Sequence, residues 1–471
     1  MTDGAAHSEI PLLTASGRTV PLHEFGTDEL FFSITDQRGV IEHANAVFVR
    51  LSGYSFDELR HQPHNIIREP AMPRGAFRLI WDELLAGRAV ASYVVNRAKD
   101  DTRYEVFATQ VPTEGGFLSI RVKPEAGGLR DRVLDIYDRA REVEAAVSGG
   151  AREQAAAGAE FILASLAEMG IPDMQTLTRQ TITHEITATL DAIAKIEDPK
   201  GPDQLEILLR KIHLVGGLLL EPLHTFEQVD RSSARLVSGF DAVRPSAALV
   251  HDLGSVLQEV TESLLFAADR DSEQAAIADL TQAAAHARTH LAAMGTDFTN
   301  ADDRVRELRL ATETLAQQTA LFALQNQMIG SFAGELLDGK TVEPPGQAMR
   351  LLHKALSAQF DELLDGIEQV NRMLRGISEP VERSRSKASG FTPRLTDWCN
   401  AAAALLHRQE HSSDRLHAAI RRVRAQAQTG LPWIRAELSD AADQKQISVK
   451  IDEQPIRATL KFIGIVTADI A

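Results

Sequence analysis

The chain has 471 residues, 44% of them hydrophobic but only 5% aromatic, which allows two or three domains and favours long helices over several aromatic-rich cores. The formal net charge of −16 disfavours a nucleic-acid or anionic-membrane partner, because both need a basic face. Cys399 is the only cysteine, so an intrachain disulfide is excluded and a reducing, cytoplasmic compartment is expected. No uncharged apolar run is long enough to span a membrane.

The first predicted domain occupies residues 28–124 and follows an N-terminal arm, residues 1–27. It begins with two strands, Phe31–Thr35 and Val40–His43, joined by a tight turn in which Gly39 can take a positive φ. Several short helices follow, and three further strands are then predicted at residues 89–97, 103–110 and 117–123. This order predicts an α+β domain, a five-stranded antiparallel sheet with a helical flap over one face.

A helical region follows the sheet and is predicted from Leu129 onward. Its first apolar stripe consists of Val133, Ile136, Tyr137, Ala140 and Val143. Glycine and proline predict breaks near residues 149–150, 170–172, 199–202 and 244–245. We assign residues 125–299 to a helical linker or bundle.

Residues 300–380 have the heptad spacing of a coiled-coil hairpin. The seam of the first arm is Val305, Leu308, Thr312, Leu315, Thr319 and Phe322. The seam of the return arm, after Pro344–Pro345, is Phe360, Leu363, Ile367, Val370, Leu374 and Ile377. Residues 381–440 predict another helical segment. In the C-terminal tail, residues 441–471, Ile447–Ile451 alternates like a strand and Ala458–Val466 could pair with it.

The most specific motif is the run Gln62–Pro73, which follows His43–Asn45 and Ser52–Tyr54 at short range. These stretches resemble the PAS sensor domain of bacterial aerotaxis receptors, with ungapped spacing through Pro112. In that family the pocket holds FAD. The resemblance therefore implies FAD as a candidate cofactor of residues 28–124.

The resemblance also suggests which side chains would line a flavin pocket. Arg68 is the position carried over from the family, Asn45 and Asn96 are candidate polar partners for a ring edge, and Trp81 is a fourth candidate. Each has a structural reading as well: Arg68 can brace the flap, Asn45 can cap a helix, and Trp81 can belong to the core. Haem bound through His64 is the second cofactor hypothesis.

A second resemblance lies in the predicted hairpin. Leu315–Leu324 resembles the descending arm of the chemoreceptor signalling hairpin, and Ala333–Glu335 matches its Ala-Gly-Glu. The hairpin is degenerate, because Ile329 and Phe332 replace the charged residues that contact the kinase in that family. The resemblance implies a partner of the chemotaxis kinase or adaptor type. Any antiparallel coiled coil with Gln and Thr in its seam is the competing reading.

The sequence thus predicts a soluble PAS-containing sensor of the chemotaxis type, which relays a redox or ligand state through its helices to a protein partner. We expect a homodimer, because heptad seams need a partner helix. An enzyme is not expected, since nucleotide-binding, metal-ligand and nucleophile motifs are missing from the sequence.

Two alternatives stay open. One is a cofactor-free dimeric interaction scaffold, which the changed family positions Glu69, Ala71 and Val90 favour. The other is a phosphotransfer component that uses His251, in a stretch that resembles the phospho-acceptor box of histidine kinases.

Overall fold

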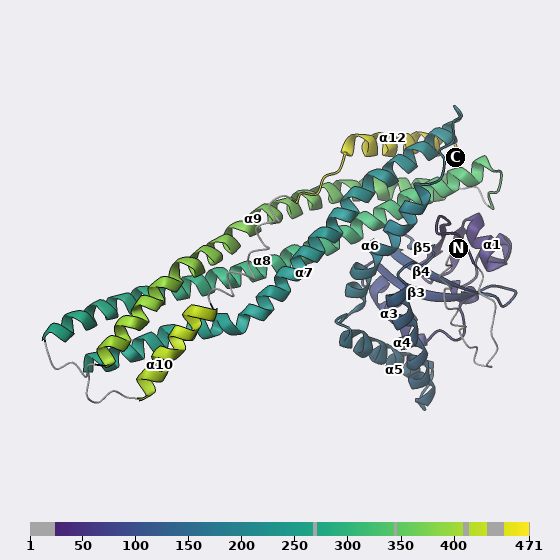
Figure 1. The fold of residues 1–471 in the computed structure, drawn as a ribbon. Coiled ribbons are helices and arrows are strands. Elements are labelled where there is room, and N and C mark those ends of the chain that lie inside the picture. The colour runs from purple at the N-terminus through teal and green to yellow at the C-terminus, as the bar shows by residue number, and fades with distance from the viewer. Residues whose placement is uncertain (1–23, 267–270, 343–345, 408–413, 431–446, 471) are drawn as a thin grey trace, which may run out of the picture. The chain divides into compact units, whose positions relative to one another are not determined.

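The computed structural model describes residues 24–266, 271–342, 346–407, 414–430 and 447–470. A five-stranded antiparallel sheet near the N-terminus is followed by a long all-helical region, so the predicted fold class is confirmed (Figure 1). The chain divides into two compact units. The first comprises Met1–His224, Thr314–Leu364 and Lys450–Ala471; the second comprises Thr225–Glu313 and Asp365–Val449. The predicted arm up to residue 23 lies outside the described residues.

The sheet has the strand order β2-β1-β5-β4-β3, with every neighbouring pair antiparallel. The strands are β1 (Phe31–Asp36), β2 (Ile41–Ala44), β3 (Val90–Arg97), β4 (Arg103–Pro112) and β5 (Gly116–Val122). Gly39 takes a φ of 76° in the β1–β2 turn, as its position between the two strands predicts. Gly116 is required for another reason, because a Cβ there would lie 1.8 Å from the carbonyl oxygen of Thr35.

The helical flap covers one face of the sheet. It consists of α1 (Ala46–Ser52), α2 (Phe56–Leu59), the 3₁₀ turn η1 (His64–Ile67) and α3 (Arg74–Leu85). Asn45 caps α1 by accepting a hydrogen bond from the N–H of Phe48, and Ser55 forms a capping box with Glu58 at α2. We call residues 24–124, with this flap, the sheet domain.

The helices that directly follow the sheet in sequence pack against the sheet domain: α4 (Gly127–Ala146), α5 (Ala151–Glu168) and α6 (Met174–Ile193). The predicted breaks at residues 149–150, 170–172 and 199–202 separate them and the next helix. α5 packs against both α3 and α4. Buried Glu144 of α4 accepts hydrogen bonds from the N–H groups of Arg74 and Gly75, at 2.9 and 2.7 Å. This carboxylate therefore satisfies orphan donors in the first turn of α3.

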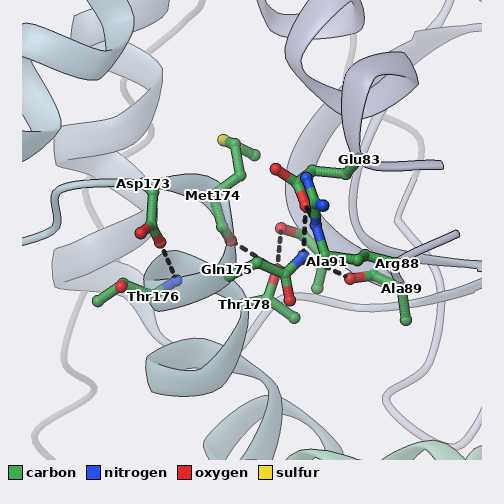
Figure 2. Close-up of polar contacts among 9 residues, drawn as sticks. All are labelled: Glu83, Arg88, Ala89, Ala91, Asp173, Met174, Gln175, Thr176 and Thr178. Carbon is green, nitrogen blue, oxygen red and sulfur yellow. Dashed lines mark hydrogen bonds and ion pairs between the residues drawn. The ribbon is translucent and has the colours of Figure 1, made fainter. Parts of the chain in front are cut away.

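α6 covers the exposed edge of the sheet at β3 (Figure 2). Oγ1 of Thr178 accepts a hydrogen bond from the N–H of Ala91 at 2.9 Å, and the Gln175 amide donates to the carbonyl of Ala89 at 2.9 Å. Asp173 caps α6 by accepting from the N–H of Thr176. These side chains pair the main-chain groups that an edge strand otherwise leaves open.

The helical remainder contains three long helices, α7 (Gln204–Phe266), α8 (Asp271–Leu337) and α9 (Gly346–Leu406). The two predicted heptad seams lie on α8 and α9 and are buried. α10 (Asp414–Ala425) is followed by a π-helical turn, η2 (Gln426–Gly430). None of the described helices has the length and apolarity needed to cross a membrane.

Two predictions for the helical remainder are wrong. α7 continues through Arg244–Pro245 without a break over its 63 residues. A proline inside a helix costs about 3 kcal/mol, but apolar residues of α7 are buried on both sides of it, among them Phe240 and Leu257, and favour a continuous helix. The strand pair in the tail is not formed, because Ala458–Val466 belongs to α12 (Glu453–Asp469). Asp452 caps that helix, and its buried residues Ile456, Leu460, Ile463 and Val466 follow helical spacing.

Candidate functional site

A cavity of about 420 Å³ lies between the inner face of the sheet and the flap. That volume falls in the range of small-molecule sites. The sheet contributes residues of β1, β3, β4 and β5, and the flap contributes η1 and α3. The aromatic part of the wall is Phe77, Trp81 and Phe117, with the rings of Trp81 and Phe117 edge to face at 5.2 Å.

Three of the four predicted pocket residues line this cavity: Arg68, Trp81 and Asn96. Asn45 does not line it. Its carboxamide oxygen instead accepts from the N–H groups of Phe32 and Phe48, and its nitrogen donates to the carbonyl of Leu30 at 3.1 Å. The helix-capping reading of Asn45 is therefore the one that the structure shows.

Arg68 joins the flap to the sheet. Its main chain forms an isolated bridge with Asn96 on β3, and its guanidinium lies 3.5 Å from the centre of the Phe77 ring. Burial, together with the nearby positive charge of Arg74, lowers the pKa of Arg68. The Nε atom of Arg68 is buried and has no hydrogen-bond partner among the described residues.

Arg121 on β5 is the residue of this wall that the sequence analysis missed. Its side chain is buried, and the guanidinium lies against the faces of Phe31 and Phe48, at 5.6 and 5.3 Å from the ring centres. No carboxylate of the described residues forms an ion pair with it; its hydrogen bonds go to His64 and Ser33. Burial lowers the pKa of Arg121 to about 10, so the group is still positively charged at neutral pH.

The contact with Arg121 fixes the state of His64. Burial, with the positive charges of Arg121 and Arg68 nearby, lowers the pKa of His64 well below its usual value, so the ring is neutral. A guanidinium can only donate, so the His64 Nε2 that Arg121 contacts must be the acceptor and the proton lies on Nδ1. Because that lone pair is occupied, the geometry disfavours His64 as an iron ligand.

Several polar atoms of the cavity wall have no hydrogen-bond partner in the part of the chain that the structure describes. They belong to Asn96 (Nδ2), Gln110 (Oε1) and Ser119 (Oγ), in addition to Nε of Arg68. In the sheet register Ser119 lies opposite both Ser33 on β1 and Gln110 on β4, so the inner face carries a continuous polar row. Buried polar groups are normally satisfied, and an unsatisfied set around one cavity therefore fits a polar ligand.

The three positions at which the chain departs from the aerotaxis pattern do not line the cavity: Glu69, Ala71 and Val90. Glu69 instead pairs with buried Arg103 at 2.9 Å and accepts a hydrogen bond from the N–H of Ala71. These departures therefore leave the wall of the cavity unchanged. Among the described residues that line the cavity none is acidic, and three are arginines: Arg38, Arg68 and Arg121.

His251 lies within α7, but the structure does not describe its side chain. The described residues contain no group of histidine, cysteine and acidic side chains that could hold a metal ion.

Comparison with known proteins finds local similarity to an aerotaxis receptor and to a regulatory protein. The chain is 43% identical over 101 residues to the aerotaxis receptor of Escherichia coli, which is 20% of each protein. It is 32% identical over 74 residues to the nitrogen fixation regulatory protein of Klebsiella pneumoniae, 16% of this chain and 15% of that protein. The chain thus matches only about a fifth or less of these relatives' length. No protein-family profile matches it.

Proposed function

We propose that the sheet domain binds a flavin and that the protein is a redox sensor which signals through its helices. The observation that carries this proposal is the cavity itself. Among the described residues it combines aromatic walls, buried Arg121 without a carboxylate partner, and unsatisfied polar atoms from β3, β4, β5 and the flap. A planar, polar-edged ring system with electron-rich atoms fits all three features. The similarity to an aerotaxis receptor supports the same reading.

Each wall residue has a distinct part in this proposal. Phe77, Trp81 and Phe117 would enclose the ring, while Asn96, Gln110 and Ser119 would satisfy their free polar atoms on its edge. A bound flavin would supply reversible acceptance of electrons. Arg121 would then stabilise negative charge that appears in the cavity, because a buried cation interacts strongly across a low dielectric.

The absorption spectrum of protein purified without added cofactor tests the proposal. We expect oxidised-flavin bands that disappear on reduction, and we expect Arg68→Ala to lose most of the bound flavin. Arg97→Ala is the matched control, since this arginine follows Asn96 on β3 but pairs with Asp101 at the surface. A featureless spectrum of folded protein, unchanged after incubation with FAD, would overturn the flavin proposal and favour a small-ligand sensor or a scaffold.

We further infer a protein partner of the chemotaxis kinase or adaptor type, together with a homodimer. The resemblance of Leu315–Leu324 to the chemoreceptor hairpin supports the first inference. Ile329 and Phe332, which replace the family's charges, are both buried within the chain. A partner would therefore have to bind another face of α8 or a rearranged state. Capture of a purified kinase or adaptor by the full-length protein, with and without reductant, tests this inference.

A further inference from the structure

The last turns of α8 lie against the sheet domain, nearly three hundred residues away in sequence. The ring of Phe332 packs edge to face on Phe32 of β1, with 4.6 Å between the ring centres. The amide nitrogen of Asn45 donates to Oγ of Ser331 at 3.3 Å. The main-chain N–H of Ala46 donates to the carboxylate of Glu335 at 3.0 Å. We call this set the α8 contact.

The α8 contact is largely buried. Phe32 and Asn45 are fully buried, and Phe332 is 1% exposed. Glu335 places a carboxylate at the N-terminus of α1, where the unsatisfied N–H groups and the helix dipole favour a negative charge. One pair of aromatic rings and two hydrogen bonds therefore hold α8 to β1 and to the start of α1.

Residues of β1 and α1 connect the α8 contact to the wall of the cavity. Phe31 and Phe32 are neighbours on β1 and point to opposite faces, Phe31 toward the flap and Phe32 toward α8. On the cavity side, the ring of Phe48 stacks on His64 at 6.0 Å and lies under the guanidinium of Arg121. On the other side, the N–H of Phe48 donates to Asn45, whose amide also holds Ser331.

We propose that the cavity signals to the helical hairpin directly through the α8 contact. This inference rests on the proposed sensor function, but it does not require that the ligand is a flavin. Negative charge in the cavity would attract Arg121 and weaken its hold on His64 and Phe48. Phe48 and Asn45 lie in the same short helix and its cap, so this change alters the stability of the α8 contact. A signal can pass along this route only if the α8 contact has a different stability in two states of the cavity.

The experiment measures hydrogen exchange of the full-length protein over residues 325–335, with residues 276–287 of α8 as an internal reference. The first arm needs no ligand and compares wild type with His64→Gln and Arg121→Gln, two changes in the cavity wall. We expect exchange at 325–335 to change about fivefold or more, the lower end of typical coupling, with the reference unchanged. Two variants are used because Arg121→Gln alone could disturb folding.

The second arm uses FAD as the probe and tests reciprocity. If the cavity and the contact are coupled, Ser331→Ala, which weakens the contact, must change the affinity for FAD, and FAD must change the stability of the contact. Ser357→Ala is the matched control, since that hydroxyl donates only to the carbonyl of His353 in its own helix. We expect the control to bind FAD as the wild type does.

The two arms separate the failure of each proposal. If FAD does not bind the wild type, the flavin function fails, and the first arm alone decides the coupling. If FAD binds but exchange at residues 325–335 is the same in all cavity variants and with FAD, the coupling is overturned and the flavin function stands. A changed exchange in the first arm supports the coupling in either case.

Discussion

At the scale of single residues, the sheet domain contains two buried arginines with opposite surroundings. Arg121 faces the cavity without a carboxylate partner among the described residues, whereas Arg103 pairs with Glu69 at 2.9 Å, with side chains only 7% and 5% exposed. Glu69 follows Arg68 in the flap, so this ion pair holds the segment that places Arg68 over the cavity. The positive charge of Arg103 is therefore paired with a carboxylate inside the fold. The positive charge of Arg121 is available to a ligand in the cavity.

Glu69→Gln tests that distinction. The variant removes the carboxylate charge of a buried ion pair, for which we expect a loss of about 3–5 kcal/mol in the free energy of unfolding. The exposed pair Arg97–Asp101 supplies the control, and Asp101→Asn should change the free energy by about 0.5 kcal/mol or less. Urea unfolding of the two variants measures both. Equal effects would show that Glu69 is not the partner that stabilises Arg103.

His64 predicts a pH dependence of stability. Its pKa in the folded protein is well below the ordinary value of 6.5, so the unfolded chain binds the proton more readily. The stability that this neutral ring contributes is complete above pH 6.5 and is lost as the pH falls below it, by up to about 1.4 kcal/mol per pH unit. Urea unfolding at pH 7.5, 6.5 and 5.5 should show a shallower loss in His64→Gln. The exposed His184→Gln should follow the wild type.

The sequence predicted the cavity residues that stand in recognisable local motifs and missed one that does not. Arg68, Asn96 and Trp81 stand in motifs whose spacing carries over, and they line the cavity. Arg121 was missed, although Ser119 and Arg121 alternate with apolar residues on β5, a signal that two polar groups share one strand face. Asn45 was misplaced because its capping role and a ligand role look the same in sequence.

At the scale of elements, the flap helix α3 depends on close backbone contact with α5. A Cβ on Gly75 would lie 2.3 Å from the main-chain nitrogen of Ala159, and one on Gly158 would lie 2.0 Å from the Glu144 carboxylate. Glycine at both positions therefore lets the two helices approach and lets Glu144 reach the first turn of α3. Since α3 carries Phe77 and Trp81, this packing also sets the shape of the cavity.

Gly75→Ala tests the close contact. The methyl group would press on main chain rather than on a flexible side chain, so we expect a loss of about 1–3 kcal/mol. Gly127→Ala is the control, because nothing lies within 4 Å of a Cβ at that position in α4. Alanine there should leave the free energy unchanged or raise it by less than about 1 kcal/mol. Thermal unfolding compares the two, and a Gly75 variant as stable as the control would contradict the packing argument.

Elements were predicted well where local chemistry decides them. The hairpin turn at Gly39, the capped short helices and the alternating strands all carry short-range signals, and the sheet forms as expected. The strand pattern of the tail failed because Asp452 offers a helix cap that the alternation of Ile447–Ile451 does not show. The return of α5 onto α3 depends on Gly75 and Gly158, eighty-odd residues apart in the chain, and no local pattern indicates it.

At the scale of the whole molecule, the heptad seams have a different meaning from the one that the sequence suggested. Val305, Leu308 and Phe322 of α8 are buried without a second chain, and Phe322 lies 5.7 Å from Phe360 of the return arm. The seam thus packs within one chain, and the reason given for expecting a homodimer no longer applies to these positions. Dimerisation itself stays a prediction.

This burial predicts how stability depends on protein concentration. When dimerisation contributes to folding, the thermal midpoint rises with concentration by mass action. Because one chain already covers the seam, we expect the thermal midpoint to stay constant over a hundredfold range of protein concentration. Light scattering would show whether a dimer dissociates within that range, and the midpoint should stay the same if it does. A midpoint that rises with concentration would show that a second copy completes the fold. Leu308→Ala should lower the midpoint in both cases, because it opens a cavity worth about 2–5 kcal/mol in a buried seam.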